Sequence, residues 1–156
     1  MSINIAFLAD HPEMVDQLAS WLFQEWGKQY YDGSIKNIYT ALSKHMNHND
    51  LPITLIAIRD EELQGTASLR IRELEIRPQY KHWLGSVYVY DDYRRQGIGT
   101  RLIQAAVVEA TRLGIHDLYL YTRQNTKLYA HLGWHEIERP ALDGAEIVIM
   151  KRTPRE

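Results

Sequence analysis

The chain contains 156 residues, 45% hydrophobic and 24% charged, which suits one folded domain with a buried core. Its formal net charge of −2 gives no general attraction to nucleic acid, and the absence of cysteine excludes disulfides and thiolate metal sites. No apolar run approaches the roughly 18 residues that a membrane span needs, and residues 1–10 do not resemble a signal peptide. We therefore expect one cytoplasmic domain over residues 1–156, with residues 152–156 as a frayed tail.

Hydrophobic periodicity divides the chain into short strands and helices. In chain order it predicts a strand at 3–7, helices over 11–26 and 35–46, strands at 52–58, 65–71 and 84–89, a helix over 97–113, a strand at 117–122, a helix over 125–132, and strands at 134–138 and 145–151. Asp10 and Ser34 stand where the N-caps of the first two helices are expected, and Gly27 stands where the first helix should end. No internal repeat or linker interrupts this series.

The connections between the predicted strands fix much of the topology. The strands at 52–58, 65–71 and 84–89 are joined by segments too short for crossovers, so they should run antiparallel to one another. The 84–89 strand and the 117–122 strand, joined by a helix, should form a right-handed parallel crossover. The sequence therefore predicts an α+β fold (mixed α/β) in three layers. Its mostly antiparallel central sheet should have about seven strands, with helices on both faces.

The segment after the 84–89 strand has the composition of an anion site. It reads Arg94-Arg95-Gln96-Gly97-Ile98-Gly99-Thr100 and leads into a long helix. The first N–H groups of a helix lack intrahelical partners, glycines allow close approach to them, and arginines add charge-assisted hydrogen bonds. The chain contains no Walker loop, and Leu102 stands where a dinucleotide-binding fingerprint requires its third glycine. A phosphate-bearing ligand of another kind is therefore expected.

Two motifs in this order connect the chain to a known family. The pattern Arg94-x-x-Gly97-x-Gly99 after an apolar strand resembles the pyrophosphate-binding motif of the GNAT superfamily of acyl-CoA N-acyltransferases. The segment Leu128-Tyr129-Ala130-His131-Leu132-Gly133-Trp134 is similar to the family's fourth-helix motif, in which Gly-aromatic follows a tyrosine. The predicted order of strands and helices is also that of the superfamily, so the resemblance covers nearly the whole chain. It implies an N-acetyltransferase that moves an acetyl group from acetyl-CoA directly to a primary amine of a small molecule or a peptide N-terminus.

The resemblance also implies a place for acetyl-CoA, with the 84–89 strand and the helix start as a parallel β-α-β cofactor-binding core and no metal. The pantetheine arm would pair with the backbone of that strand, and Tyr129 would protonate the departing thiolate. The residues implied for coenzyme A are Val87, Val89, Arg94, Arg95, Gln96, Gly97, Ile98, Gly99, Thr100 and Asn125. Many members carry an asparagine seven residues before the tyrosine. Thr122 stands there in this chain, so Asn125 is the nearest substitute.

No motif indicates the base that accepts the proton of the amine. Six side chains are open to this role: Glu73, Glu75, Asp91 and Asp92 as carboxylates, and Tyr88 and Tyr119 as relays through water. We rank Glu75 and Tyr88 first. The turn at Tyr30-Tyr31 is expected to border the acceptor. The connection Tyr121-Thr122-Arg123-Gln124-Asn125 resembles that of an N-terminal acetyltransferase branch that acts on acidic actin ends, and this resemblance implies a contact of Arg123 with an acidic acceptor.

Other functions remain open from the sequence. A non-catalytic acyl-CoA-binding module would have the same fold and the same loop, and a nucleotide-binding regulator would also use a phosphate site. His45 and His48, or His131 and His135, have spacings found in metal sites, but Gly133 interrupts the second pair and no glutamate completes either. We expect no metal, no nucleic acid partner and no membrane partner, and a homodimer is left open.

Overall fold

The computed structural model describes residues 2–154, apart from the side chains of residues 29 and 30. The strands are β1 (Asn4–Phe7), β2 (Ile53–Arg59), β3 (Glu62–Ile71), β4 (His82–Val89), β5 (Leu118–Thr122), β6 (His135–Glu138), β7 (Ala141–Leu142), β8 (Ala145–Glu146) and β9 (Val148–Arg152). The helices are α1 (Val15–Tyr30), α2 (Ile35–Lys44), α3 (Ile98–Arg112) and α4 (Thr126–His131). Short 3-10 turns, η1 (Leu8–Asp10), η2 (Pro12–Met14) and η3 (Asp91–Tyr93), complete the fold.

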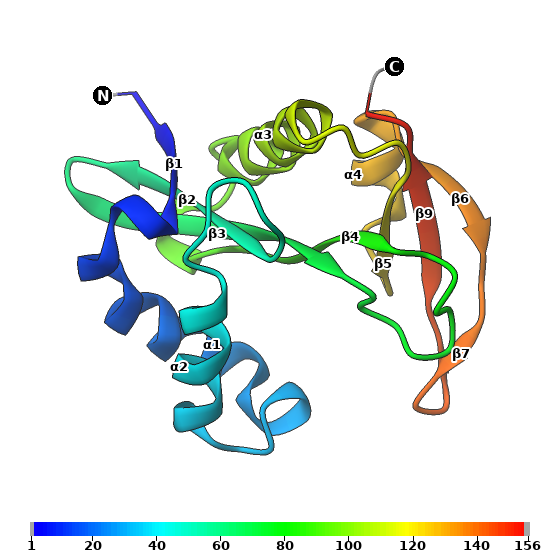
Figure 1. Cartoon of the computed structure of the whole chain (residues 1–156), viewed down its shortest axis with the longest axis horizontal. Helices are drawn as coiled ribbons and strands as arrows, with labels where there is room; N and C mark the ends of the chain where they lie inside the picture. The colour runs from blue at the N-terminus through cyan, green and yellow to red at the C-terminus, as the bar shows by residue number, and fades with distance from the viewer. Residues whose placement is uncertain (1, 155–156) are drawn as a thin grey trace.

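Within the described residues, seven strands form one sheet in the order β1-β2-β3-β4-β5-β9-β6, and β7 and β8 form a separate hairpin. Neighbouring strands of the large sheet are antiparallel except β4 and β5, which are parallel. Helices α3 and α4 cover one face, and α1 and α2 cover the other (Figure 1). The predicted three-layer α+β fold, with its antiparallel central strands and its parallel pair, is therefore confirmed.

The central elements form where burial on both faces favours them. Ile53 to Ile58 in β2 are all buried, as expected for a strand with helices on both sides. On α3, the apolar residues recur at three- and four-residue steps, so they form one stripe that packs on β2, β3 and β4. A second core, formed largely by α1, α2 and η1, fills the opposite face. The sheet is packed between two apolar layers, and this packing fixes the positions of its strand ends.

Strand β4 leaves the regular ladder halfway along its length. Its register with β3 shifts between Thr66 and Ser68, and Ser86 adopts a φ of +51°, as in a β-bulge. Among the described residues, β4 and β5 are paired at one position, Trp83 with Tyr119. The two strands separate beyond that point, so the side of β4 that faces β5 has no ladder partner along residues 84–89.

Several sequence predictions are wrong at the element ends. Helix α1 runs through Gly27 to Tyr30, and its end is marked by Gly33, whose N–H donates to the Gly27 oxygen at 2.8 Å with a φ of +69°. The helix starts at Val15, after two 3-10 turns, so Asp10 is not its cap; that carboxylate instead contacts His48 Nε2 at 2.7 Å.

The predicted frayed tail is also wrong in part. Arg152 is the last residue of β9, and its Nε donates to the Leu132 oxygen at 3.2 Å. The carbonyl of Pro154 accepts a hydrogen bond from Thr111 Oγ1 at 3.0 Å, so the chain is held against α3 to this point. Residues 155–156 lie outside the described residues. The β7–β8 hairpin was not predicted, because strands this short carry no detectable period.

Candidate active site

Two cavities meet where β4 and β5 separate. The α2-side cavity, of about 550 Å³, extends toward the ends of α1 and α2, and the α3-side cavity, of about 800 Å³, extends toward the start of α3. The two cavities share six lining residues, which are Trp26, Val87, Thr122, Arg123, Asn125 and Tyr129. A ligand that fills both cavities must therefore pass these side chains.

The α3-side cavity contains an exposed helix start. The first hydrogen bond of α3 runs from Arg101 N–H to the Gly97 oxygen at 3.1 Å, so helix geometry leaves the N–H groups of residues 98–100 without intrahelical partners. Gly97 precedes the helix with a φ of +79°, and no atom lies within 4 Å of the place where a Cβ would stand. An anion can therefore approach these N–H groups closely, and the helix dipole attracts it.

The loop before this helix is shaped by its arginines in different ways. The Arg94 guanidinium donates from Nε to the Val89 oxygen at 2.9 Å, pairs with Asp91 at 2.7 Å and lies over the Tyr88 ring. Arg94 thereby fastens the loop to the end of β4 while still lining the cavity. Arg95 is exposed, has a φ of +64° and also lines the cavity. These two cations and the free helix start together favour a ligand with several negative charges.

The wall between the cavities is the open edge of β4. Val87 lies at the bulge and lines both cavities, and Val89 lines the α3-side cavity. Both valines pack against the core beneath α3, so their side chains hold this edge in place. Because β5 is not paired here, an extended ligand arm can take up the backbone groups of β4 as an added strand would.

Tyr129 of α4 lies at the junction of the two cavities. Its side chain is 8% exposed and packs edge-on against Trp134, with ring centroids 6.2 Å apart. Burial raises the pKa of the Tyr129 phenol to about 12, so the hydroxyl is protonated at neutral pH. No hydrogen bond joins this hydroxyl to another of the residues 2–154. Tyr129 therefore presents a protonated hydroxyl, not engaged by the described residues, at the junction of the two cavities.

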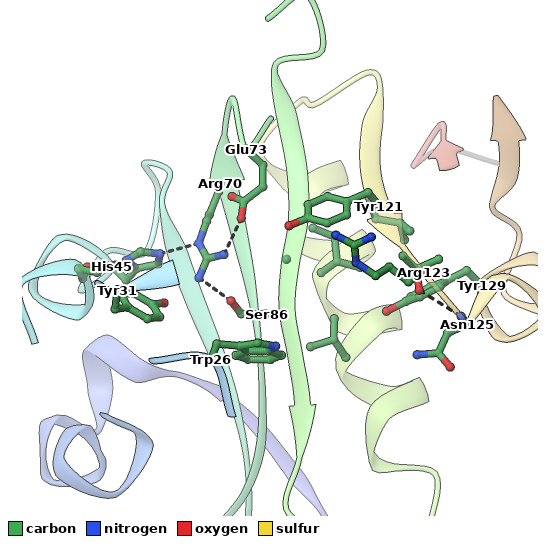
Figure 2. A pocket seen from close by; sticks show the side chains of 16 residues that line it. Trp26, Tyr31, His45, Arg70, Glu73, Ser86, Tyr121, Arg123, Asn125 and Tyr129 are labelled. Atoms are coloured by element: carbon green, nitrogen blue, oxygen red, sulfur yellow. Dashed lines mark hydrogen bonds and ion pairs between the residues drawn. The ribbon is translucent and has the colours of Figure 1, made fainter. Parts of the chain in front are cut away.

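The α2-side cavity holds a polar network centred on Arg70 of β3 (Figure 2). The guanidinium donates from Nε to His45 Nε2 at 3.2 Å, from Nη1 to Glu73 Oε1 at 3.1 Å and from Nη2 to Ser86 Oγ at 2.7 Å. These contacts tie the end of α2 and the loop after β3 to the bulge of β4. Arg70 therefore sets the position of the carboxylate that faces the cavity.

His45 is held neutral within this network. Burial, followed by the charge of Arg70, lowers the pKa of the imidazole to about 4. Its Nδ1 lies 2.7 Å from the Ala41 oxygen and donates to it, and its Nε2 accepts from Arg70. Both ring nitrogens are occupied, so His45 orients Arg70 and does not take protons from a ligand at neutral pH.

Known proteins resemble this chain in sequence and in fold. The family model described as the acetyltransferase (GNAT) family matches residues 13–134, which is most of the chain. The chain belongs to the GNAT acetyltransferase family. The matched range includes α3 with its preceding loop, the open edge of β4, and Tyr129.

Solved structures agree with this GNAT fold. An aminoglycoside 6'-N-acetyltransferase complexed with coenzyme A matches at 20% identity with a TM-score of 0.76, over 99% of this chain and 97% of that chain. The aminoglycoside 6'-N-acetyltransferase from Enterococcus faecium matches at 22% identity with a TM-score of 0.74, over 99% of this chain and 97% of that chain. The PaiA N-acetyltransferase from Thermoplasma acidophilum, in complex with coenzyme A, matches at 23% identity with a TM-score of 0.70, over 98% of this chain and 99% of that chain. These identities show a shared fold and leave the substrate open. A comparison with curated proteins finds no match.

Most residues that the sequence assigned to coenzyme A line the α3-side cavity of this GNAT domain. These are Val87, Val89, Arg94, Arg95, Gly97, Ile98, Gly99, Thr100 and Asn125. Gln96 is not among the lining residues, because its Oε1 accepts a hydrogen bond from Arg59 at 2.5 Å on the far side of the loop. Asn125 lines both cavities, and its backbone N–H donates to Thr122 Oγ1 at 3.1 Å, which positions the start of α4.

The residues considered as bases do not all line the cavities. Glu73 lines the α2-side cavity, whereas Glu75 is exposed and lines neither cavity, because the turn closed by Arg77 N–H on the Leu74 oxygen directs residue 75 outward. Tyr88 lines the α3-side cavity, and burial raises the pKa of its phenol, so it is neutral and not a base at neutral pH.

The remaining candidates lie away from both cavities. Asp91 pairs with Arg94, Asp92 is exposed, and Tyr119 stacks on Tyr80 with ring centroids 4.3 Å apart. Arg70, which organises the acceptor side, was not predicted, because β3 alone does not reveal what its side chain reaches. Tyr31 lines the α2-side cavity as expected, and the side chain of Tyr30 lies outside the described residues.

Two classes of feature are missing from the described part of the chain. Within residues 2–154, no three His, Asp or Glu side chains are grouped so that they could hold a metal ion. In the same residues, no helix has the length and apolar character that crossing a membrane requires.

Proposed function

We propose that this GNAT acetyltransferase transfers an acetyl group from acetyl-CoA directly to a primary amine of a small molecule or a peptide N-terminus. The observation that carries the proposal is the position of Tyr129, a protonated phenol at the junction of the two cavities. Family membership and two coenzyme A complexes among the structural neighbours support an acyl-CoA co-substrate. The α3-side cavity would take the co-substrate and the α2-side cavity would take the amine.

The residues proposed to hold the co-substrate fit its chemistry. The diphosphate would accept hydrogen bonds from the free N–H groups of residues 98–100 and from Arg95, with Gly97 leaving room for it. The pantetheine arm, which carries amide groups, would pair with the open backbone of β4 at Val87 and Val89. A main-chain N–H near Val89 would then polarise the thioester carbonyl. Asn125 would offer its amide to the same arm.

The proposed chemistry must remove a proton from the attacking amine and stabilise the negative charge that develops on the leaving sulfur. Glu73 would accept the proton of the attacking amine, directly or through one water, because its carboxylate lines the amine side of the junction. Arg70 holds Oε1 of this carboxylate, and no described residue bonds Oε2, so one oxygen is available. Tyr129 would donate its hydrogen bond to the sulfur as the C–S bond breaks. No acyl-enzyme is formed, which agrees with a chain that contains no cysteine.

The test is a screen for release of the free thiol of coenzyme A from acetyl-CoA, with a panel of small amines, amino acids, aminoglycosides and peptides. We expect turnover above the rate without protein for at least one amine, and loss of turnover with retained coenzyme A binding in Tyr129→Phe. If coenzyme A binds and no amine is acetylated, the chain is a binding module of the same fold and the proposal is wrong.

A further inference from the structure

The charges around the α2-side cavity are unusual for a site that receives a cationic amine. The ionised side chains that line it are Arg70, Arg123 and Glu73, which give one more positive than negative charge. His45 also lines the cavity but is neutral, for the reasons given above. The cavity therefore offers a single carboxylate, and that carboxylate is already paired with Arg70 at 3.1 Å.

Arg123 carries the charge that is not balanced. It follows β5 on the turn into α4, is exposed, and lines both cavities. Its Nη2 contacts the Leu142 oxygen at 3.4 Å, a neutral acceptor at the limit of hydrogen-bond distance. Figure 2 shows Arg123 with Tyr121, Asn125 and Tyr129 on one side of β4, and Arg70 with Glu73 on the other. The free cation thus lies on the same wall as the proposed proton donor.

We infer that the acceptor carries a carboxylate close to its primary amine, and that Arg123 binds this carboxylate. A planar guanidinium suits the two oxygens of a carboxylate and leaves the amine free to reach Glu73. The inference rests on the proposed function and specifies its acceptor. Free amino acids and peptides that begin with an acidic residue share this chemistry.

The same charges disfavour polycationic acceptors. A molecule with several ammonium groups needs several carboxylates around it, and each ammonium placed near Arg123 would be repelled. Among the described residues of the α2-side cavity, Glu73 is the one carboxylate available for such a molecule. Although some of the structural neighbours are aminoglycoside acetyltransferases, this cavity is a poor match for an aminoglycoside.

The first test compares acceptors in matched pairs with the full chain. Each pair keeps the amine and replaces the carboxylate by an amide: an amino acid and its α-amide, and peptides that begin with aspartate or asparagine. We expect kcat/KM to be at least about tenfold higher for the carboxylate member of at least one pair. That pair identifies the source as a free amino acid or a peptide end. Kanamycin and spermidine should be poorer acceptors than the best carboxylate.

The second test uses Arg123→Gln, with Lys127→Gln as the matched control. Lys127 is exposed on α4 and lines neither cavity, so its variant changes the net charge equally without touching the site. Arg123→Gln should raise the KM for the carboxylate acceptor roughly tenfold or more. The KM for the amide acceptor and the KM for acetyl-CoA should both stay unchanged. Lys127→Gln should match the parent protein with every acceptor.

The outcomes separate this inference from the function on which it rests. If polycations or amides are acetylated faster than carboxylates, the acceptor assignment is overturned while the acetyltransferase function stands. If Arg123→Gln raises KM for acetyl-CoA and leaves the carboxylate preference intact, Arg123 serves the co-substrate and the assignment is again overturned. If no amine releases coenzyme A, the proposed function itself has failed.

Discussion

Replacing Tyr129 by phenylalanine removes one hydroxyl from the junction of the two cavities. The pKa of about 12 for this phenol lies above the value of about 8.5 for an ordinary thiol. Complete transfer of its proton to the thiolate would therefore cost about 5 kcal/mol, so most of the benefit comes from a hydrogen bond to the charged sulfur. Such a bond contributes about 1.5–3 kcal/mol, and its loss lowers kcat by about 10- to 150-fold.

The assay is thiol release at saturating acetyl-CoA and amine, together with calorimetry of coenzyme A binding. Because the hydroxyl bonds none of the other described residues, its removal should leave the fold unchanged. The neutral thiol of free coenzyme A is a weak hydrogen-bond acceptor, so its affinity should fall by only about a few-fold. Tyr119→Phe is the matched control, since Tyr119 is also 8% exposed but lines neither cavity. The reasoning is refuted if Tyr129→Phe keeps more than about a third of the parent kcat, or if the control loses as much.

Three further predictions follow from the same geometry. Gly97→Glu should weaken coenzyme A binding by at least about 100-fold in calorimetry, through like-charge repulsion. Gly97→Ala, which meets no neighbour within 4 Å but is strained at a φ of +79°, should weaken coenzyme A binding less than Gly97→Glu does. Glu73→Gln should lower kcat/KM by about 100-fold, while Glu75→Gln should leave kcat/KM unchanged; equal losses in the two variants would contradict the assignment. The folded-state pKa of His45, about 4, lies below its ordinary value, so the unfolded chain protonates first. Denaturant titrations should therefore show full stability above about pH 6.5, a loss of up to about 3 kcal/mol toward pH 4, and a flatter profile in His45→Gln.

The features of the fold that could be predicted from the sequence are those whose signal lies within a short segment of the chain. The apolar stripe of α3, the glycines at its start and the motif around Tyr129 are each encoded in a few neighbouring residues. The short connections between β2, β3 and β4 constrained the sheet in the same way. The fold and the family were predicted correctly because helix period, loop chemistry and chain length act on the same segment that carries the signal.

The acceptor side required contacts between distant segments. Arg70 joins residues 25 positions before it and 16 positions after it, and no local pattern reports such pairs. Glu73 and Glu75 are indistinguishable in sequence, and only the turn after Leu74 decides which one faces the cavity. Gly27 was mistaken for a helix end because tertiary packing of α1 outweighs the roughly 1 kcal/mol cost of an internal glycine.

The separation of β4 from β5 also bears on how the chain avoids self-association. A row of free backbone groups on a strand is a template for strands of other molecules, and outer edges of sheets are the usual place for this hazard. Here the unpaired row belongs to an inner strand, recessed between two neighbours and covered on one face by α3. A strand of another molecule must pass the neighbouring strands to reach these groups, whereas an outer edge is reached directly. The inner position of this unpaired row therefore lowers its tendency to pair with strands of other molecules.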